Sequence, residues 1–126
     1  MKLTRTPKIL IGAATAIVSL SPLLFFLFPF IPIFFLISAG ANEPDPSIML
    51  VFLLIFPLMM LIGFLQFGLM IFYIAHIVKN KPAAELLLII LAVGTYIMPY
   101  LAMPVYYFIY IWPDDPPDWA LAPPVS

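Results

Sequence analysis

Three long apolar segments that contain no charged residue constrain this chain more than any other feature. They run over Ile9–Ile37, Ile48–Val78 and Leu86–Trp112. Each is longer than the ~20 residues that cross a hydrocarbon core of ~30 Å as a helix. Because lipid offers the backbone no hydrogen-bond partners, a segment that spans it must be helical. The sequence therefore predicts an all-α integral membrane protein with three transmembrane helices.

The composition supports this class and excludes several others. Hydrophobic residues make up 65% of the chain and charged residues only 9%, too few to cover the surface of a small soluble domain. The chain has no cysteine, which excludes disulfides, thiol catalysis and cysteine-ligated metals. It has no long basic stretch, so we expect no nucleic-acid partner.

Prolines interrupt all three segments and are expected to kink or end the helices. Pro29 and Pro32 lie close enough together to end the first helix, and a phenylalanine-rich interfacial segment should follow. We treat residues 1–126 as a single membrane domain with short loops. The predicted elements are a helix over 9–30, an interfacial segment over 31–37, an outer loop over 38–47, a helix over 48–78, an inner turn over 79–85, a helix over 86–112 and an extended proline-rich outer tail over 113–126.

The charged residues predict the orientation. All five basic residues precede the first segment or lie between the second and third: Lys2, Arg5, Lys8, Lys79 and Lys81. Lysine and arginine accumulate on the cytoplasmic side of membrane proteins. With three spans, the N-terminus would be cytoplasmic and the acidic C-terminal tail outside. We expect a multi-pass protein of the cytoplasmic (inner) membrane of a bacterium, with its C-terminus periplasmic.

Small and polar residues inside the segments are candidates for helix packing. Gly12, Ala16 and Ser19 fall on one face of the first helix, where a second backbone could approach closely. Gln66 is the one strongly polar, uncharged side chain deep in the second helix. Its carboxamide needs an interhelical partner, which Thr95 or Tyr96 could supply.

Tyrosines crowd the third helix. Tyr96, Tyr100, Tyr107 and Tyr110, together with Met103, follow helical spacing. They predict either an aromatic belt at the outer interface or a stripe that contacts a partner or pigment.

His76, the only histidine, lies near the cytoplasmic end of the second helix, where it could also act as a proton-sensing group. There it either complements the helix dipole or ligates a haem or chlorin, for which a second chain would have to supply the other ligand.

The sequence does not contain the groups that catalysis requires. No base stands near a nucleophile, the paired carboxylates lie on a flexible tail, and there is no glycine-rich phosphate loop. We therefore expect no enzyme activity, no catalytic residue, no metal site and no cofactor, although lipid or pigment contacts are compatible with the sequence.

Residues 56–111 resemble the two-helix membrane hairpin at the N-terminus of phospholipase D-type enzymes, such as bacterial cardiolipin synthases, and of small bacterial membrane proteins. The resemblance lies in the basic turn Lys79-Asn80-Lys81 and in Pro99, Ala102 and Tyr106 of the following helix. That hairpin usually has a tryptophan early in its second helix and a glycine at the position of Ala102. This chain has leucine or isoleucine in place of the tryptophan and alanine in place of the glycine. The catalytic His-x-Lys motif is missing, so the resemblance implies an interaction hairpin without lipase activity.

These features favour a non-catalytic accessory or structural subunit of a larger cytoplasmic-membrane complex. Its partners would be membrane lipids and other integral membrane subunits. One alternative is a stand-alone regulatory or toxin-immunity membrane protein. Another is a pigment-binding, haem-binding or small channel subunit.

Overall fold

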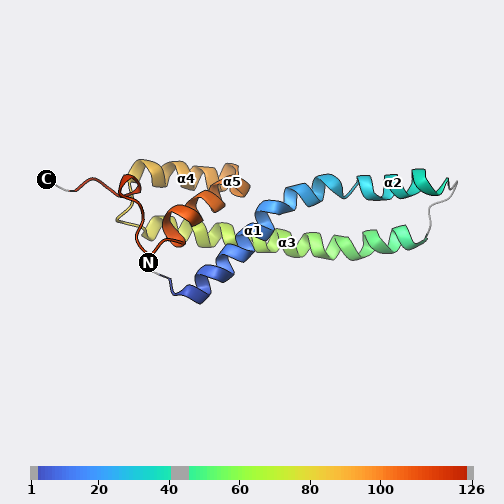
Figure 1. Cartoon of the computed structure of the whole chain (residues 1–126), viewed down its shortest axis with the longest axis horizontal. Helices are drawn as coiled ribbons and strands as arrows, with labels where there is room; N and C mark the ends of the chain where they lie inside the picture. Colours follow the sequence, from blue (N-terminus) through green and yellow to red (C-terminus); the bar gives the residue numbers. More distant parts are fainter. Residues whose placement is uncertain (1–2, 41–45, 125–126) are drawn as a thin grey trace.

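The computed structural model describes residues 3–40 and 46–124, and helices dominate it (Figure 1). The elements are α1 (Arg5–Leu27), α2 (Phe30–Ala39), α3 (Pro46–Lys79), α4 (Glu85–Ile97), α5 (Pro99–Tyr106), the π-helix η1 (Tyr107–Ile111) and the 3-10 helix η2 (Asp118–Ala120). Two of the helices, α1 and Met49–Lys79 within α3, are long and apolar enough to cross a membrane. The all-helical class is therefore confirmed.

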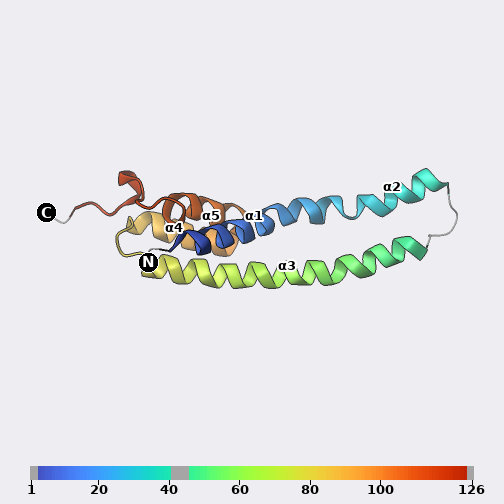
Figure 2. The same cartoon turned by 60° about the horizontal axis from the view of Figure 1, so that its bottom comes forward.

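The first apolar segment forms two helices rather than a helix and an irregular interfacial segment. α1 ends just before Pro29, which has no N–H to donate, and α2 begins immediately after it. The two helices follow one another along α3, which runs back beside them (Figure 2). The predicted interfacial segment over 31–37 is thus helical. α2 ends at Gly40, which takes the left-handed conformation common after a helix end.

The third apolar segment is not a single helix, and here the prediction of a continuous helix over 86–112 is wrong. The helix breaks at Met98, whose φ of −132° and ψ of 66° are not helical. Met98 precedes Pro99, and the proline ring disfavours helical geometry in the preceding residue. α4 and α5 then pack side by side as a hairpin (Figure 1). A Cβ added at Gly94 would lie only 3.1 Å from the Cβ of Ala102.

Each arm of this hairpin is too short to span the membrane. α4 has 13 residues, which corresponds to ~20 Å of helix. The returning arm runs from Pro99 to Ile111 through α5 and η1 and has a similar reach. Both are shorter than the ~30 Å hydrocarbon core. The hairpin starts and finishes next to the C-terminal end of α3, where residues 82–84 meet the tail.

The C-terminal tail consequently lies at the same end as the N-terminus. The backbone N–H of Ala84 donates to the carbonyl of Ala120 at 3.0 Å, and that of Ala122 donates to Pro82 at 2.8 Å. The prediction that the tail lies opposite the N-terminus is therefore wrong. Residues 80–84, which connect α3 to α4, and the tail form one surface, which we call the polar end.

The core is concentrated near the polar end. Val18, Tyr73, Met103 and Tyr106 are completely buried, where α1, α3 and the hairpin meet. The other half of the molecule is an elongated stem. On one side of it the end of α1 is followed by α2, and on the other side lies the first half of α3. Apolar side chains along this stem are exposed, which suits a lipid environment.

Candidate functional site

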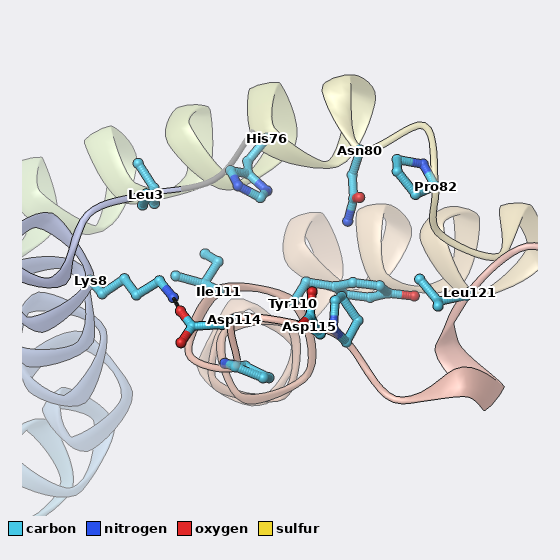
Figure 3. Close-up of a pocket in the computed structure, with 12 residues that line it drawn as sticks. Leu3, Lys8, His76, Asn80, Pro82, Tyr110, Ile111, Asp114, Asp115 and Leu121 are labelled. Atoms are coloured by element: carbon cyan, nitrogen blue, oxygen red, sulfur yellow. Dashed lines mark hydrogen bonds and ion pairs between the residues drawn. The ribbon is translucent and has the colours of Figure 1, made fainter.

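A partly open cavity of about 410 Å³ lies at the polar end (Figure 3). Three parts of the chain line it: the N-terminal residues, the end of α3, and η1 with the tail. Its polar lining consists of Lys8, His76, Asn80, Tyr110, Asp114 and Asp115, and its apolar lining of Leu3, Pro82, Ile111, Pro113, Pro116 and Leu121. The α4–α5 hairpin creates this cavity, because it returns the chain to the end of α3.

A buried hydrogen-bond network forms the α3 side of the cavity. The hydroxyl of Tyr106 lies 2.7 Å from Nδ1 of His76 and accepts a hydrogen bond from Nδ2 of Asn80 at 3.1 Å. A phenol has one proton to donate. Its oxygen has two acceptor lone pairs, so the hydroxyl can serve both side chains at once. The network fixes the side chains of His76 and Asn80 against α5.

Tyrosines of η1 hold the tail and the N-terminus together. Tyr107 donates to the carbonyl of Lys8 at 2.8 Å, and Tyr110 donates to the carbonyl of Ala120 at 2.7 Å. These contacts explain why η1 packs against α1 and not against lipid.

An ion pair closes one side of the cavity. Nζ of Lys8 lies 2.8 Å from a carboxylate oxygen of Asp114 and donates a second bond to the carbonyl of Trp112 at 3.3 Å. The lysine side chain is 12% exposed and the aspartate side chain 95% exposed. An ion pair this accessible contributes little stability, but it places a cation and a carboxylate together at the cavity wall.

The three small residues predicted to form one packing face of α1 do not share an environment. The ring of Tyr107 packs directly on Gly12, while Ala16 is exposed and Ser19 is half-buried. The buried residues of α1 are Thr15, Val18 and Ser21. The sequence analysis missed the bond between the hydroxyls of Thr15 and Tyr73, which lie 2.6 Å apart and join α1 to α3. The available signal was that the polar residues Thr15 and Ser21 lie three residues before and after Val18, and so near the same face of α1.

Gln66 has a different partner from the two that the sequence suggested. Its Oε1 accepts a hydrogen bond from the hydroxyl of Tyr100 at 3.3 Å. Thr95 instead bonds the carbonyl of Leu91 within its own helix, and Tyr96 is 74% exposed. The helix break at Met98 causes this difference, because it turns Tyr100 toward α3.

The tyrosine stripe is therefore split. Tyr107, Tyr110 and Met103 are buried against the rest of the chain at the polar end, Tyr100 is half-buried and Tyr96 is exposed. The buried members form contacts within the chain, so they do not make an aromatic belt at the opposite interface.

His76 is 4% exposed and lines the cavity. In the described part of the chain, no group of three or more histidine or acidic side chains is placed to hold a metal ion.

No family model, curated protein or solved structure matches this chain. The resemblance to the phospholipase D-type hairpin stays a prediction, and the function must be argued from the geometry.

Proposed function

We propose that this chain is a non-catalytic accessory subunit of a larger membrane-protein complex. In this proposal α1 and α3 span the cytoplasmic membrane, and the α4–α5 hairpin enters it from the polar end. The four basic residues that the structure describes, Arg5, Lys8, Lys79 and Lys81, lie at or next to that end. The positive-inside rule then favours a cytoplasmic polar end, with both termini in the cytoplasm.

The observation that carries the proposal is a set of incompletely bonded polar groups at mid-membrane depth. Gln66 precedes Lys79, the last residue of α3, by 13 positions, which corresponds to ~20 Å of helix. Its Oε1 bonds Tyr100, while its amide nitrogen makes no hydrogen bond to a described residue. The hydroxyl of Tyr96 is exposed beside the hairpin tip and also bonds no described residue.

Such groups favour a protein neighbour over lipid. An amide or hydroxyl donor that faces hydrocarbon without an acceptor carries a free-energy cost of several kcal/mol, on the order of the water-to-alkane transfer values. A helix of another subunit can supply the acceptor, and polar residues are common at helix contacts in membranes. Gln66, Tyr96 and Tyr100 would then form one side of a subunit interface.

The surface of α3 supports close approach by such a helix. Gly63, three residues before Gln66 and so near the same face of α3, is exposed, and a Cβ added there would meet no atom within 4 Å. Small residues allow neighbouring backbones in a membrane to come close together. The uncovered apolar stem offers further contact area to the same partner.

The test is to isolate the tagged chain from its native membranes in a mild detergent and to identify co-purifying proteins by mass spectrometry. The wild type should retain an integral membrane protein in a fixed ratio. Gln66→Leu and Tyr96→Phe should each lose most of it, because they remove the unbonded donors.

The matched control is Ile90→Leu, which changes an exposed apolar residue of α4 and should retain the partner. A wild-type chain that purifies as a monodisperse species without any other membrane protein would contradict the proposal and favour a stand-alone protein.

A further inference from the structure

The two tryptophans of the chain are both exposed, and both lie at or beside the polar end. Trp112 is 54% exposed and Trp119 is 67% exposed. Tryptophan is highly buried on average in soluble proteins. In membrane proteins it collects where the hydrocarbon meets the lipid headgroups. An exposed pair at one end of two long apolar helices therefore points to that layer.

η2, which contains Trp119, is held level with the start of α4. The carbonyl of Ala120 accepts a hydrogen bond from the backbone N–H of Ala84, the N-cap of α4, at 3.0 Å. The same carbonyl accepts a bond from the hydroxyl of Tyr110 at 2.7 Å. In both views of the molecule the tail passes the start of α4 (Figure 1 and Figure 2). Because Ala84 precedes one arm of the hairpin and Tyr110 lies near the end of the other, η2 is bonded to both.

The helix surfaces change from apolar to charged at this level. On α4, Glu85 is followed by Leu86, which is 71% exposed. On α3, Val78 is 76% exposed and is followed by Lys79. Charged side chains are costly inside hydrocarbon, so in the proposed membrane location the edge of the hydrocarbon falls near these residues. η2 consequently lies at this edge rather than in the water beyond it.

The indole of Trp119 faces away from the rest of the chain. Ala120, the next residue, is completely buried, whereas the indole N–H of Trp119, which can only donate, bonds no described residue. Prolines at positions 116 and 117 restrict the backbone just before η2. An indole held in this way can pack its ring on the acyl chains and donate its N–H to a lipid oxygen.

We propose that Trp112 and Trp119 anchor the polar end in the headgroup layer of the membrane, with η2 lying in that layer beside α4. The anchor fixes the depth of both arms of the hairpin, because Ala120 is bonded to both. Lipid suits this surface better than a soluble partner does, since the exposed indole adjoins the start of the exposed apolar surface of α4. The inference rests on the proposed membrane location and requires no partner subunit.

The experiment is fluorescence quenching in vesicles made from phosphatidylcholine that is brominated either near the headgroup or near the ends of its acyl chains. Since the chain has two tryptophans, Trp112→Phe reports Trp119 alone and Trp119→Phe reports Trp112 alone. Each should lose more fluorescence to the shallow bromines than to the deep ones. The depth reference is Phe64→Trp in a chain that lacks both native tryptophans. Phe64 is exposed at the midpoint of Met49–Lys79, so its replacement should show the reverse order.

Quenching of Trp119 by aqueous iodide and by neither brominated lipid would overturn the proposal, and would leave Trp119 available to a soluble partner. Stronger quenching by the deep bromines would also overturn it, because η2 would then lie within the hydrocarbon.

A second measurement tests whether the indole holds the tail. Ala122→Cys provides a single thiol, because the chain has no cysteine, and its reaction with an impermeant reagent is timed in nanodiscs. Adding Trp119→Ser should speed the reaction roughly tenfold, in keeping with the loss of one buried aromatic ring. Trp119→Tyr keeps a ring with a polar tip and should react as slowly as the native tryptophan. Equal rates for serine and tryptophan at this position would contradict the anchor.

These results are separable from the fate of the subunit proposal. Gln66→Leu, which loses the partner, should keep the quenching order, and so should a chain that has no partner. If the membrane location itself were wrong, the Phe64→Trp reference would be quenched by neither lipid.

Discussion

Replacing Gly12 by alanine should loosen the hairpin from α1. A Cβ at this position would overlap the hydroxyl of Tyr107 and lie 2.7 Å from its ring carbon Cζ. The ring has little room to retreat, because Tyr107 is 5% exposed and its hydroxyl is bonded to the carbonyl of Lys8 at 2.8 Å. The substitution therefore forces Tyr107 to move and weakens the bond that ties η1 to the N-terminus.

The expected loss follows from three contributions. Overpacking of a well-packed site costs ~1–3 kcal/mol, and loss of the Tyr107 hydrogen bond costs ~0.5–1.5 kcal/mol. Against these, alanine gains up to ~1 kcal/mol over glycine in helix propensity. The net decrease in the free energy of unfolding should be about 0.5–3.5 kcal/mol, measured by SDS titration in mixed micelles and followed by circular dichroism.

Gly63→Ala is the matched control, since a Cβ there meets no atom within 4 Å. It should be neutral or slightly stabilising. Tyr107→Leu should remove much of the penalty of Gly12→Ala, and the two substitutions together should show a coupling of ~1 kcal/mol or more. Equal behaviour of Gly12→Ala and Gly63→Ala would refute the packing of Tyr107 on α1.

Three further predictions address the polar end. Cysteines introduced at Lys81 and Asp118 should react with an impermeant thiol reagent from the same side of sealed vesicles. Reaction from opposite sides would show that the third apolar segment crosses the membrane. Tyr106→Phe should lower the free energy of unfolding by about 1–3 kcal/mol, because it leaves buried His76 without its hydroxyl partner; an unchanged SDS midpoint would rule out a stabilising network. Asp114→Asn should cost less than ~1 kcal/mol because the carboxylate is exposed, and a larger loss in the same titration would show that the ion pair is shielded from solvent.

The helical class and the second helix were predictable, because long charge-free segments leave few alternatives in lipid. The prediction of 48–78 differs from Pro46–Lys79 by two residues at one end and one at the other. The reversal at Met98 was harder to predict, since a proline can kink a helix without reversing it. One available signal was the placement of the small residues Gly94 and Ala102, each four residues from Met98, which face each other across the hairpin.

The site could not be predicted once the third segment had been taken as a single span. A continuous helix would place Tyr106 and Tyr110 far from His76, whereas the hairpin returns them to it. In a straight helix over 86–112, Tyr106 and Tyr110 would lie near the end that is far from the C-terminal end of the second helix. Their hydroxyl partners lie on α3 and the tail, which no local pattern brings together.

The hairpin also changes where the acidic tail lies relative to the basic residues. Among the described residues, the polar end carries four basic side chains and four acidic ones: Arg5, Lys8, Lys79 and Lys81, and Glu85, Asp114, Asp115 and Asp118. The acidic tail therefore lies beside basic residues of the N-terminal segment rather than at the opposite end of the molecule. The positive-inside rule counts lysine and arginine and gives little weight to acids, so the proposed orientation of the N-terminus survives this rearrangement.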